Sequence, residues 1–136
     1  MMRTDVFFDT NVVVYAMVGD TFLADGSWTI LRAGGTVSVQ VLNESANTLR
    51  RKFSFDWPDL VEAAAQLHEL CDVIPLTEEI HVRGLALAER YSLSIYDGMI
   101  VAAAQLAGCT TLYSEDMHDG LVIDGLTIRN PYAASG

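Results

Sequence analysis

The stretch VFFDTNVVVYA at residues 6–16 decides the fold, because it places an acidic residue, Asp9, directly after a short apolar run. The β-branched and aromatic residues at 6–8 predict a buried strand that ends at this acid. Further runs with strand character follow at 36–39, 73–76, 110–113 and, more weakly, 126–128. The sequence therefore predicts a sheet of four to five strands.

Helical patterns lie between these strands. Apolar residues recur at helical spacing in four stretches, at 42–53, 60–71, 80–91 and 100–107. Helix starts are indicated where Asp56 precedes Pro58 and where Thr77 precedes two glutamates. Short strands that alternate with helices predict right-handed crossovers and a mostly parallel sheet with both faces covered. The expected fold class is α/β.

Size and composition indicate one compact domain over residues 1–136. The chain has 136 residues, of which 51% are hydrophobic and 19% charged, values typical of a globular protein. We expect disorder only in the tail at 131–136. Since no apolar run approaches the roughly 20 residues that cross a bilayer, we expect a cytoplasmic protein without a membrane partner.

The cysteines and tryptophans are expected to have packing roles. Cys71 and Cys109 have apolar neighbours and no CxxC spacing, so buried free thiols are predicted rather than a disulfide or a zinc site. For Trp28 and Trp57, packing in the core or in an interface is favoured over stacking on nucleic-acid bases.

Four acidic residues lie at breaks between the predicted elements. Asp9 follows the first strand and Asp116 the fourth, Glu44 lies in the first turns of the helix after the second strand, and Asp97 opens the last helix. In open α/β sheets, ligands bind beyond the carboxyl ends of the strands, so all four acids are expected at one rim. Carboxylates without a nearby lysine repel one another, and hard divalent cations would remove that repulsion.

Three of these acids also have a structural interpretation. Asp9 precedes Thr10 and Asn11, a sequence suited to a turn or helix N-cap. A lone glutamate such as Glu44 is most often a solvated helix residue. The sequence SIYD that ends at Asp97 matches a capping box, in which the acid only satisfies backbone N–H groups.

The fourth acid has close competitors. Asp116 belongs to the polar cluster SEDMHDG, where Glu115 and Asp119 are equally suited to a turn. Position alone does not choose among the three. The combination favours a site, because one fold brings four acids to one rim and leaves coordination positions open for water and phosphate.

The net charge of −10 argues against nucleic-acid binding. Two divalent ions would change the balance to −10 + 4 = −6 and would concentrate positive charge where a phosphate sits. Three of the eight basic residues, at 50–52, are also consecutive. Arg51 lies seven residues after Glu44 on roughly the same helix face, which makes it a candidate contact for a backbone phosphate. The alternative is a solvated basic helix end that complements the helix dipole.

Four segments resemble the motifs of PIN-domain ribonucleases, and most of all the VapC-type toxins of type II toxin–antitoxin modules. They are FFDTNVVVYA, SVQVLNE, SLSIYDGMIVAAA and TLYSEDMHDG, which occur in the family's order and span nearly the whole chain. Individually such acidic motifs are common. Four in order are specific.

The resemblance implies a three-layer α/β/α sandwich, dependence on Mg²⁺ or Mn²⁺, and single-stranded RNA as substrate. It identifies the catalytic acids as Asp9, Glu44, Asp97 and Asp116, of which Asp9, Asp97 and Asp116 are expected to bind metal. The expected supporting residues are Thr10, Asn11, Ser114 and, as a competitor of Asp116, Asp119. The implied partners are a cognate antitoxin that covers the acidic cleft and a second copy of the chain in a homodimer.

The expected function is a metal-dependent endoribonuclease that cleaves single-stranded RNA with a metal-activated water, acting as the toxin of such a pair. Two alternatives keep the fold: a non-toxin PIN-domain nuclease in RNA processing, and a non-catalytic metal-binding or interaction module. A signalling receiver domain also carries acids at a sheet edge, but it needs a lysine late in the chain. The only lysine here is Lys52.

Overall fold

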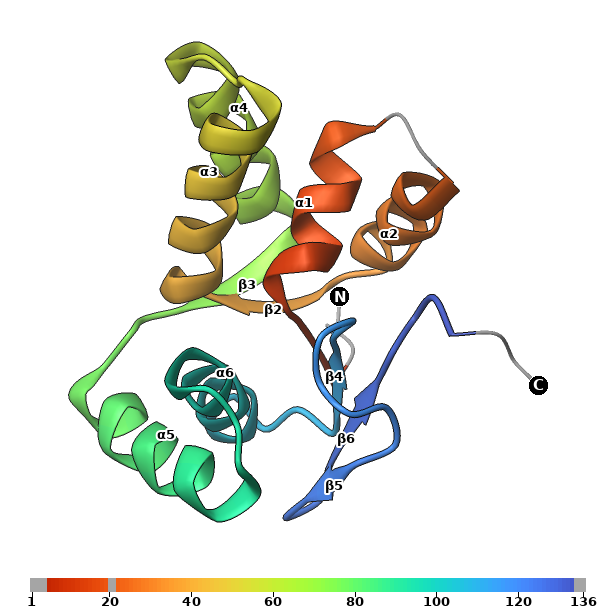
Figure 1. The fold of residues 1–136 in the computed structure, drawn as a ribbon. Coiled ribbons are helices and arrows are strands. Elements are labelled where there is room, and N and C mark those ends of the chain that lie inside the picture. Colours follow the sequence, from red (N-terminus) through yellow and green to blue (C-terminus); the bar gives the residue numbers. More distant parts are fainter. Residues whose placement is uncertain (1–4, 20–21, 134–136) are drawn as a thin grey trace.

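The centre of the molecule is a six-stranded sheet in a computed structural model that describes residues 5–19 and 22–133 (Figure 1). Its strands are β1 (Val6–Phe8), β2 (Gly35–Ser38), β3 (Cys71–Ile74), β4 (Thr111–Tyr113), β5 (Val122–Ile123) and β6 (Leu126–Arg129). They run side by side in the order β3-β2-β1-β4-β6-β5. All neighbouring pairs are parallel except β5 with β6.

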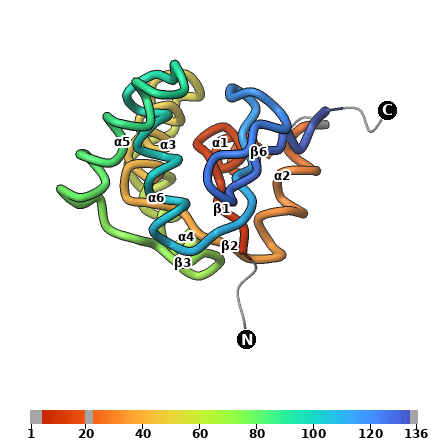
Figure 2. The backbone as a smooth tube through the Cα atoms, turned by 90° about the horizontal axis from the view of Figure 1, so that it is seen from below, coloured from red at the N-terminus to blue at the C-terminus, as the bar shows by residue number. Residues whose placement is uncertain are grey.

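Helices cover both faces of this sheet. They are α1 (Thr10–Val18), α2 (Phe22–Arg32), α3 (Val39–Phe53), α4 (Trp57–Leu70), α5 (Glu78–Tyr91) and α6 (Ile95–Leu106). Figure 1 shows α1 to α4 on one side of the sheet and α5 with α6 on the other, and Figure 2 shows α5 beside α6 from below. The arrangement confirms the expected α/β/α sandwich with a mostly parallel sheet.

The core lies around the central strand β1. Phe7 and Phe8 point to opposite faces of the sheet, and neither has any exposed surface. The neighbouring strand β4 contributes Leu112, and α6 contributes Val101 and Ala102, all fully buried. Burial on both faces explains why β1 reads as an apolar run without alternation.

The sheet has six strands rather than the expected four to five, and one predicted strand has other bounds. The strand expected at 73–76 begins at Cys71 and ends at Ile74, because Pro75 has no N–H to donate to a ladder. Strand β5 was not predicted at all. It forms a hairpin with β6 through Asp124 and Gly125, whose φ angles of 48° and 86° are those of a type I′ turn.

Helix α6 packs closely on α5 through two glycines. A Cβ added at Gly84 would stand 2.6 Å from Cγ of Met99, and one added at Gly98 would collide with the carbonyl oxygen of Gly84. Only residues without a side chain allow this approach. Because Gly98 directly follows Asp97, the contact also fixes where the first turn of α6 stands.

The last described residues pack near the N-terminal helix. Residues 131–133 form a turn, and the half-buried ring of Tyr132 lies edge-on to Tyr15. The disorder expected at 131–136 stays a prediction, and 134–136 lie outside the described part. Cys71 and Cys109 are buried free thiols, as predicted. None of the helices in the described ranges is long and apolar enough to span a membrane.

Candidate metal site at the carboxyl edge of the sheet

Asp9 and Ser114 are the first residues beyond the paired ends of β1 and β4. The register pairs Phe8 with Tyr113, and the N–H of Asp9 continues the ladder by donating to the carbonyl of Tyr113 over 3.0 Å. The strand order turns here, since β2 and β3 lie on one side of β1, and β4, β6 and β5 on the other. Crevices at such switch points are where ligands bind in open α/β sheets.

The carboxylate of Asp9 is buried and held from two sides. Its Oδ1 accepts a hydrogen bond from the N–H of Thr10 over 2.6 Å, so Asp9 is the N-cap of α1. Its Oδ2 accepts from the hydroxyl of Ser114 over 2.7 Å. Only 4% of the residue is exposed. Asp9 thus caps helix α1, as one interpretation of the sequence expected. It also lies close enough to Asp97 and Asp116 to interact with their charges.

Burial raises the pKa of Asp9 from 3.8 to about 6. Hydrogen bonds from Ser114 and Thr10 lower the pKa, whereas the negative charges of Asp97 and Asp116 raise it further. The three acids, from three separate elements, therefore share one electrostatic environment.

Asp97 lies in the first turn of α6 and is half-buried. The hydroxyl of Ser94 caps this helix by accepting from the N–H of Asp97 over 3.1 Å. Burial raises the pKa of the Asp97 carboxyl, a hydrogen bond with Ser94 lowers it, and the charge of Asp116 raises it. Ser94 thus caps the helix. The negative charge of Asp116 acts on the carboxylate of Asp97.

Asp116 and Asp119 have different surroundings in the loop after β4. Asp116 is exposed, and its Oδ2 accepts from Nδ2 of Asn11 over 2.9 Å. Asp119 instead accepts from the N–H of Asn130 over 2.8 Å through Oδ1, which holds the loop against the end of β6. The geometry favours Asp116 as the acid that joins Asp9 and Asp97.

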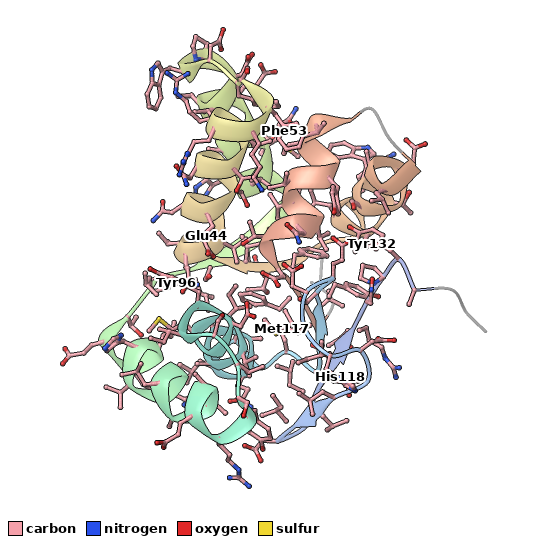
Figure 3. All side chains as sticks on the ribbon, in the orientation of Figure 1. Glu44, Phe53, Tyr96, Met117, His118 and Tyr132 are labelled. Atoms are coloured by element: carbon pink, nitrogen blue, oxygen red, sulfur yellow. The ribbon has the colours of Figure 1, made fainter. Side chains whose placement is uncertain are left out.

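Glu44 reaches the same group of residues from α3. Its half-buried carboxylate accepts from Oγ1 of Thr10 over 3.4 Å and from Nε2 of Gln40 over 3.3 Å. The side chain of Gln40 is buried, and its Nε2 also donates to the carbonyl of Tyr96 over 3.1 Å. Thr10 therefore links Glu44 to Asp9, and Gln40 links it to the start of α6. Figure 3 shows Glu44 and Tyr96 near each other, where the start of α3 approaches the start of α6.

Sequence reasoning did not single out Gln40 or the pair formed by Tyr15 and Glu115. The hydroxyl of Tyr15 donates to Oε2 of Glu115 over 2.6 Å, and this hydrogen bond is the main reason that the pKa of Tyr15 rises to about 12. Nδ2 of Asn11 also lies 3.5 Å from the same oxygen. An available signal was the spacing of four residues, from Asn11 to Tyr15 and from Gln40 to Glu44, which places side chains together on a helix.

The residues present fit a hard divalent cation with an open coordination sphere. In the described ranges, no group of three or more His, Cys, Asp or Glu side chains is placed to hold a metal ion. A closed cage is not required, because Mg²⁺ keeps several waters and typically takes one or two carboxylates plus substrate phosphates. The donors are oxygen atoms, and among the described residues no Lys, Arg or His forms an ion pair with the four acids.

Arg51 lies in the exposed last turn of α3. Its neighbour Arg50 stacks 4.5 Å from the ring centre of Trp57 and donates to the carbonyl of Phe55. Trp57 is 66% exposed and so does not lie in the core, whereas Trp28 packs against the core. Packing of Trp57 in an interface stays a prediction. Of the two arginines, Arg51 is the one placed in line with Glu44.

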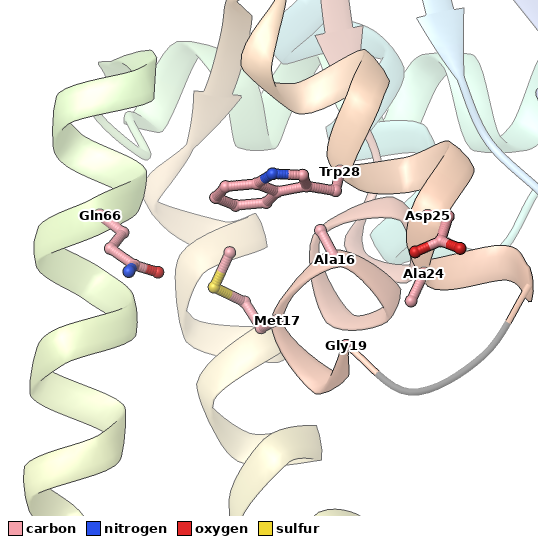
Figure 4. A pocket seen from close by; sticks show the side chains of 7 residues that line it. All are labelled: Ala16, Met17, Gly19, Ala24, Asp25, Trp28 and Gln66. Atoms are coloured by element: carbon pink, nitrogen blue, oxygen red, sulfur yellow. The ribbon is translucent and has the colours of Figure 1, made fainter.

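A hollow of about 300 Å³ lies between α1, α2 and α4, away from the acids (Figure 4). Trp28 and Met17 border it, and Gln66 faces it from α4. None of the four acids lines this space. The convergence of carboxylates, rather than the size of a cavity, therefore identifies the candidate site.

Solved structures with the same fold include several toxin–antitoxin proteins. A toxin–antitoxin complex from Klebsiella pneumoniae aligns with a TM-score of 0.71 at 22% identity, covering 93% of this chain and 98% of that chain. VapC20 of Mycobacterium tuberculosis, a toxin that cleaves the sarcin-ricin loop, aligns with a TM-score of 0.69 at 19% identity, covering 82% and 89%. DNA-bound VapBC from Salmonella typhimurium gives 0.68 at 15% identity, covering 94% and 98%.

These likenesses establish the fold, and a sequence-family comparison establishes the family. No curated protein sequence matches the chain. The model of the PIN domain matches residues 6–118, which contain all four acids. The resemblance to PIN domains that the sequence motifs indicated is confirmed, and the chain belongs to the PIN domain family.

Proposed function

We propose that this PIN domain is a divalent-metal-dependent endoribonuclease that cleaves single-stranded RNA. The observation that carries the proposal is the buried carboxylate of Asp9, whose pKa is raised in part by the charges of Asp97 and Asp116. Such a group of acids at the carboxyl edge of a parallel sheet is suited to hold a cation against a phosphodiester. Membership of the PIN family supports nuclease chemistry.

Asp9, Asp97 and Asp116 would hold Mg²⁺ or Mn²⁺. The bound ion supplies Lewis acidity toward the phosphodiester and lowers the pKa of a water molecule. The protein holds these ligands through neighbouring side chains: Ser114 and Thr10 direct the two oxygens of Asp9, and Asn11 directs Asp116. Loss of a donor that orients a ligand in this way typically lowers metal affinity or activity by about 10- to 100-fold.

Glu44 would orient the attacking water. Its carboxylate is fixed by Thr10 and Gln40 rather than free in solvent, which suits a group that must accept from a water in one direction. Because water attacks phosphorus in place of the RNA 2′-hydroxyl, the products should be a 5′-phosphate and a 3′-hydroxyl. Ends with a 2′,3′-cyclic phosphate would contradict this mechanism.

The cellular role that we propose is that of a toxin paired with an antitoxin. The similar structures from Klebsiella pneumoniae and Salmonella typhimurium are toxin–antitoxin complexes, and the second is described as bound to DNA. With a net charge of −10, the protein is suited to bind a basic antitoxin segment, such as one that inserts an arginine among the acids. A homodimer in the cytoplasm completes the proposal. A short adjacent gene whose product blocks cleavage would support this role over a function in RNA processing.

The decisive experiment is RNA cleavage with mapped ends. Wild-type protein should cut single-stranded RNA with Mg²⁺ or Mn²⁺ and should stop when EDTA is added. Asp97→Asn should be inactive while its circular dichroism spectrum matches that of the wild type. If the wild type is inactive with both metals, or if Asp97→Asn remains active, the site is a non-catalytic binding module or the chemistry lies elsewhere.

A further inference from the structure

An exposed aromatic residue directly precedes one of the proposed metal ligands in the chain. Tyr96 lies in the first turn of α6, one residue before Asp97, and 64% of it is exposed. The preceding residue, Ile95, is 53% exposed. Adjacent Cα atoms lie about 3.8 Å apart, so this apolar surface begins at the rim of the acidic site.

The ring of Tyr96 differs from the other four tyrosine rings. Each of those has an aromatic, cationic or hydrogen-bonding partner: Tyr15 with Tyr132, Tyr113 with Phe8, Tyr91 with Arg90, and Tyr132 with Ser27. Among the described residues, no ring contact or side-chain hydrogen bond involves Tyr96. The protein therefore holds an aromatic face available to a ligand.

The backbone beneath this ring is fixed. The buried amide of Gln40 donates both to the carbonyl of Tyr96 and to the carboxylate of Glu44. The same turn is pressed against α5, where Gly98 leaves no space for a side chain. A rigid support means that little entropy is lost when a flat ligand settles on the ring.

We propose that Tyr96 is a stacking platform for a nucleobase that flanks the cleaved phosphodiester. The proposal rests on the proposed nuclease function and names a substrate contact of that site. Aromatic side chains bind single-stranded nucleic acid by stacking on bases, and every base offers a π face. While Asp9, Asp97 and Asp116 act at the phosphate, Tyr96 would hold the neighbouring base and favour unpaired RNA over a duplex, whose bases are already stacked.

The test combines changes in the protein with changes in the RNA. Tyr96→Ala should lower the affinity for a short single-stranded RNA, and kcat/KM for its cleavage, by about 10-fold, within the range found for base–aromatic stacking. Tyr96→Phe keeps the ring and should behave like the wild type. An RNA with one abasic nucleotide beside the mapped cleavage position should bind the wild type about 10-fold more weakly. On Tyr96→Ala the abasic change should have little further effect.

Trp57→Ala is the matched control, because Trp57 is equally exposed but stands at the start of α4. It should leave affinity unchanged. The inference is overturned if Tyr96→Ala binds like the wild type, if Trp57→Ala loses as much affinity, or if the abasic and alanine losses simply add. A wild type that binds through Tyr96 but never cleaves would refute the nuclease function alone. If the wild type cleaves and Tyr96→Ala cleaves at the same rate, the stacking role alone is refuted.

Discussion

The hydroxyl of Ser114 donates a 2.7 Å hydrogen bond to Oδ2 of Asp9, and this buried contact joins the end of β4 to the end of β1. Ser114 has no exposed surface, and its oxygen also accepts from the N–H of Met117 over 3.3 Å. One hydroxyl thus orients the most buried acid and begins the loop that carries Asp116. The contact lowers the pKa of Asp9 against the opposing effect of burial.

Ser114→Ala should therefore move the acidic limb of the pH–rate profile to higher pH. Without the hydroxyl, the pKa of Asp9 rises further above about 6, and less of the ionised form is available at pH 6. We expect a loss of about 10- to 100-fold at that pH, with partial recovery above pH 8. Thr77→Ala, which removes the cap of the distant helix α5, should cost about 1 kcal/mol of stability and leave the profile in place. Equal profiles for wild type and Ser114→Ala would contradict the role of this hydroxyl.

Asp9→Asn should stabilise the metal-free protein at neutral pH while abolishing cleavage. The pKa of Asp9 in the folded protein, about 6, lies above the ordinary value of 3.8. Folding thus favours the neutral acid, so its contribution to stability is present below about pH 4 and is lost as pH rises through about 6. The difference corresponds to about 3 kcal/mol at pH 8.

Urea unfolding in EDTA at several pH values measures this effect. The advantage of Asp9→Asn should shrink as pH falls from 8 to 4. Saturating Mg²⁺ should raise the stability of the wild type, because ligands that bind only the folded state stabilise it, and should have little effect on the variant. An advantage that does not vary with pH would mean that the charge of Asp9 is not the cause.

Gln40→Leu should lower both the stability of the protein and the rate of cleavage. The change removes the donor shared by Glu44 and the carbonyl of Tyr96, which should cost about 1 to 2 kcal/mol and lower kcat about 10-fold. Gln105→Leu is a matched control, since Gln105 of α6 donates to the carbonyl of Ile123 over 3.1 Å, away from the acids. Similar losses of kcat in both variants would show that Gln40 has only a structural role.

The parts of this site that were predictable from the sequence follow from chain order. An acid after an apolar run, as at Asp9 and Asp116, must stand at the carboxyl edge once the sheet is parallel. The free thiols and the strand at 6–8 depend on local composition, and the structure confirms both. Such features can be predicted from a short stretch of sequence, because the residues of each element determine which of its surfaces is apolar and becomes buried.

Other features depended on contacts between distant segments. Helix α1 has three consecutive buried valines, so no polar face marked it as a helix. The choice between Asp116 and Asp119 depends on Asn130, 11 residues beyond Asp119, whose N–H engages Asp119. The bond from Gln40 to Tyr96 spans 56 residues. No sequence pattern within α3 predicts which of its faces contacts α6.

Gly98→Ala should destabilise the protein, whereas Gly26→Ala should stabilise it. A methyl group at Gly98 would collide with the carbonyl of Gly84 and must push α6 away from α5, which should cost about 1 to 3 kcal/mol. Gly26 lies within α2 with nothing within 4 Å of an added Cβ, so alanine should add about 0.5 to 1 kcal/mol by helix propensity. Thermal unfolding of both variants measures the two signs. Because Gly98 follows Asp97, its variant should also lose metal affinity, and an unchanged affinity would show that the first turn of α6 tolerates the shift.

Arg51→Ala should weaken RNA binding and reduce its dependence on salt. Arg51 lies seven residues after Glu44 on α3, about 10 Å along the helix axis, and its side chain is exposed in a protein of net charge −10. Loss of one phosphate contact on a single strand should lower the slope of log affinity against log salt by roughly 0.7. Arg90→Ala makes the same change in net charge on α5, where Arg90 lies 5.4 Å from the ring of Tyr91, and should leave the slope unchanged. If Arg51→Ala retains both affinity and slope, Arg51 is only a solvated residue at the helix end, and the RNA strand leaves the acids by another face.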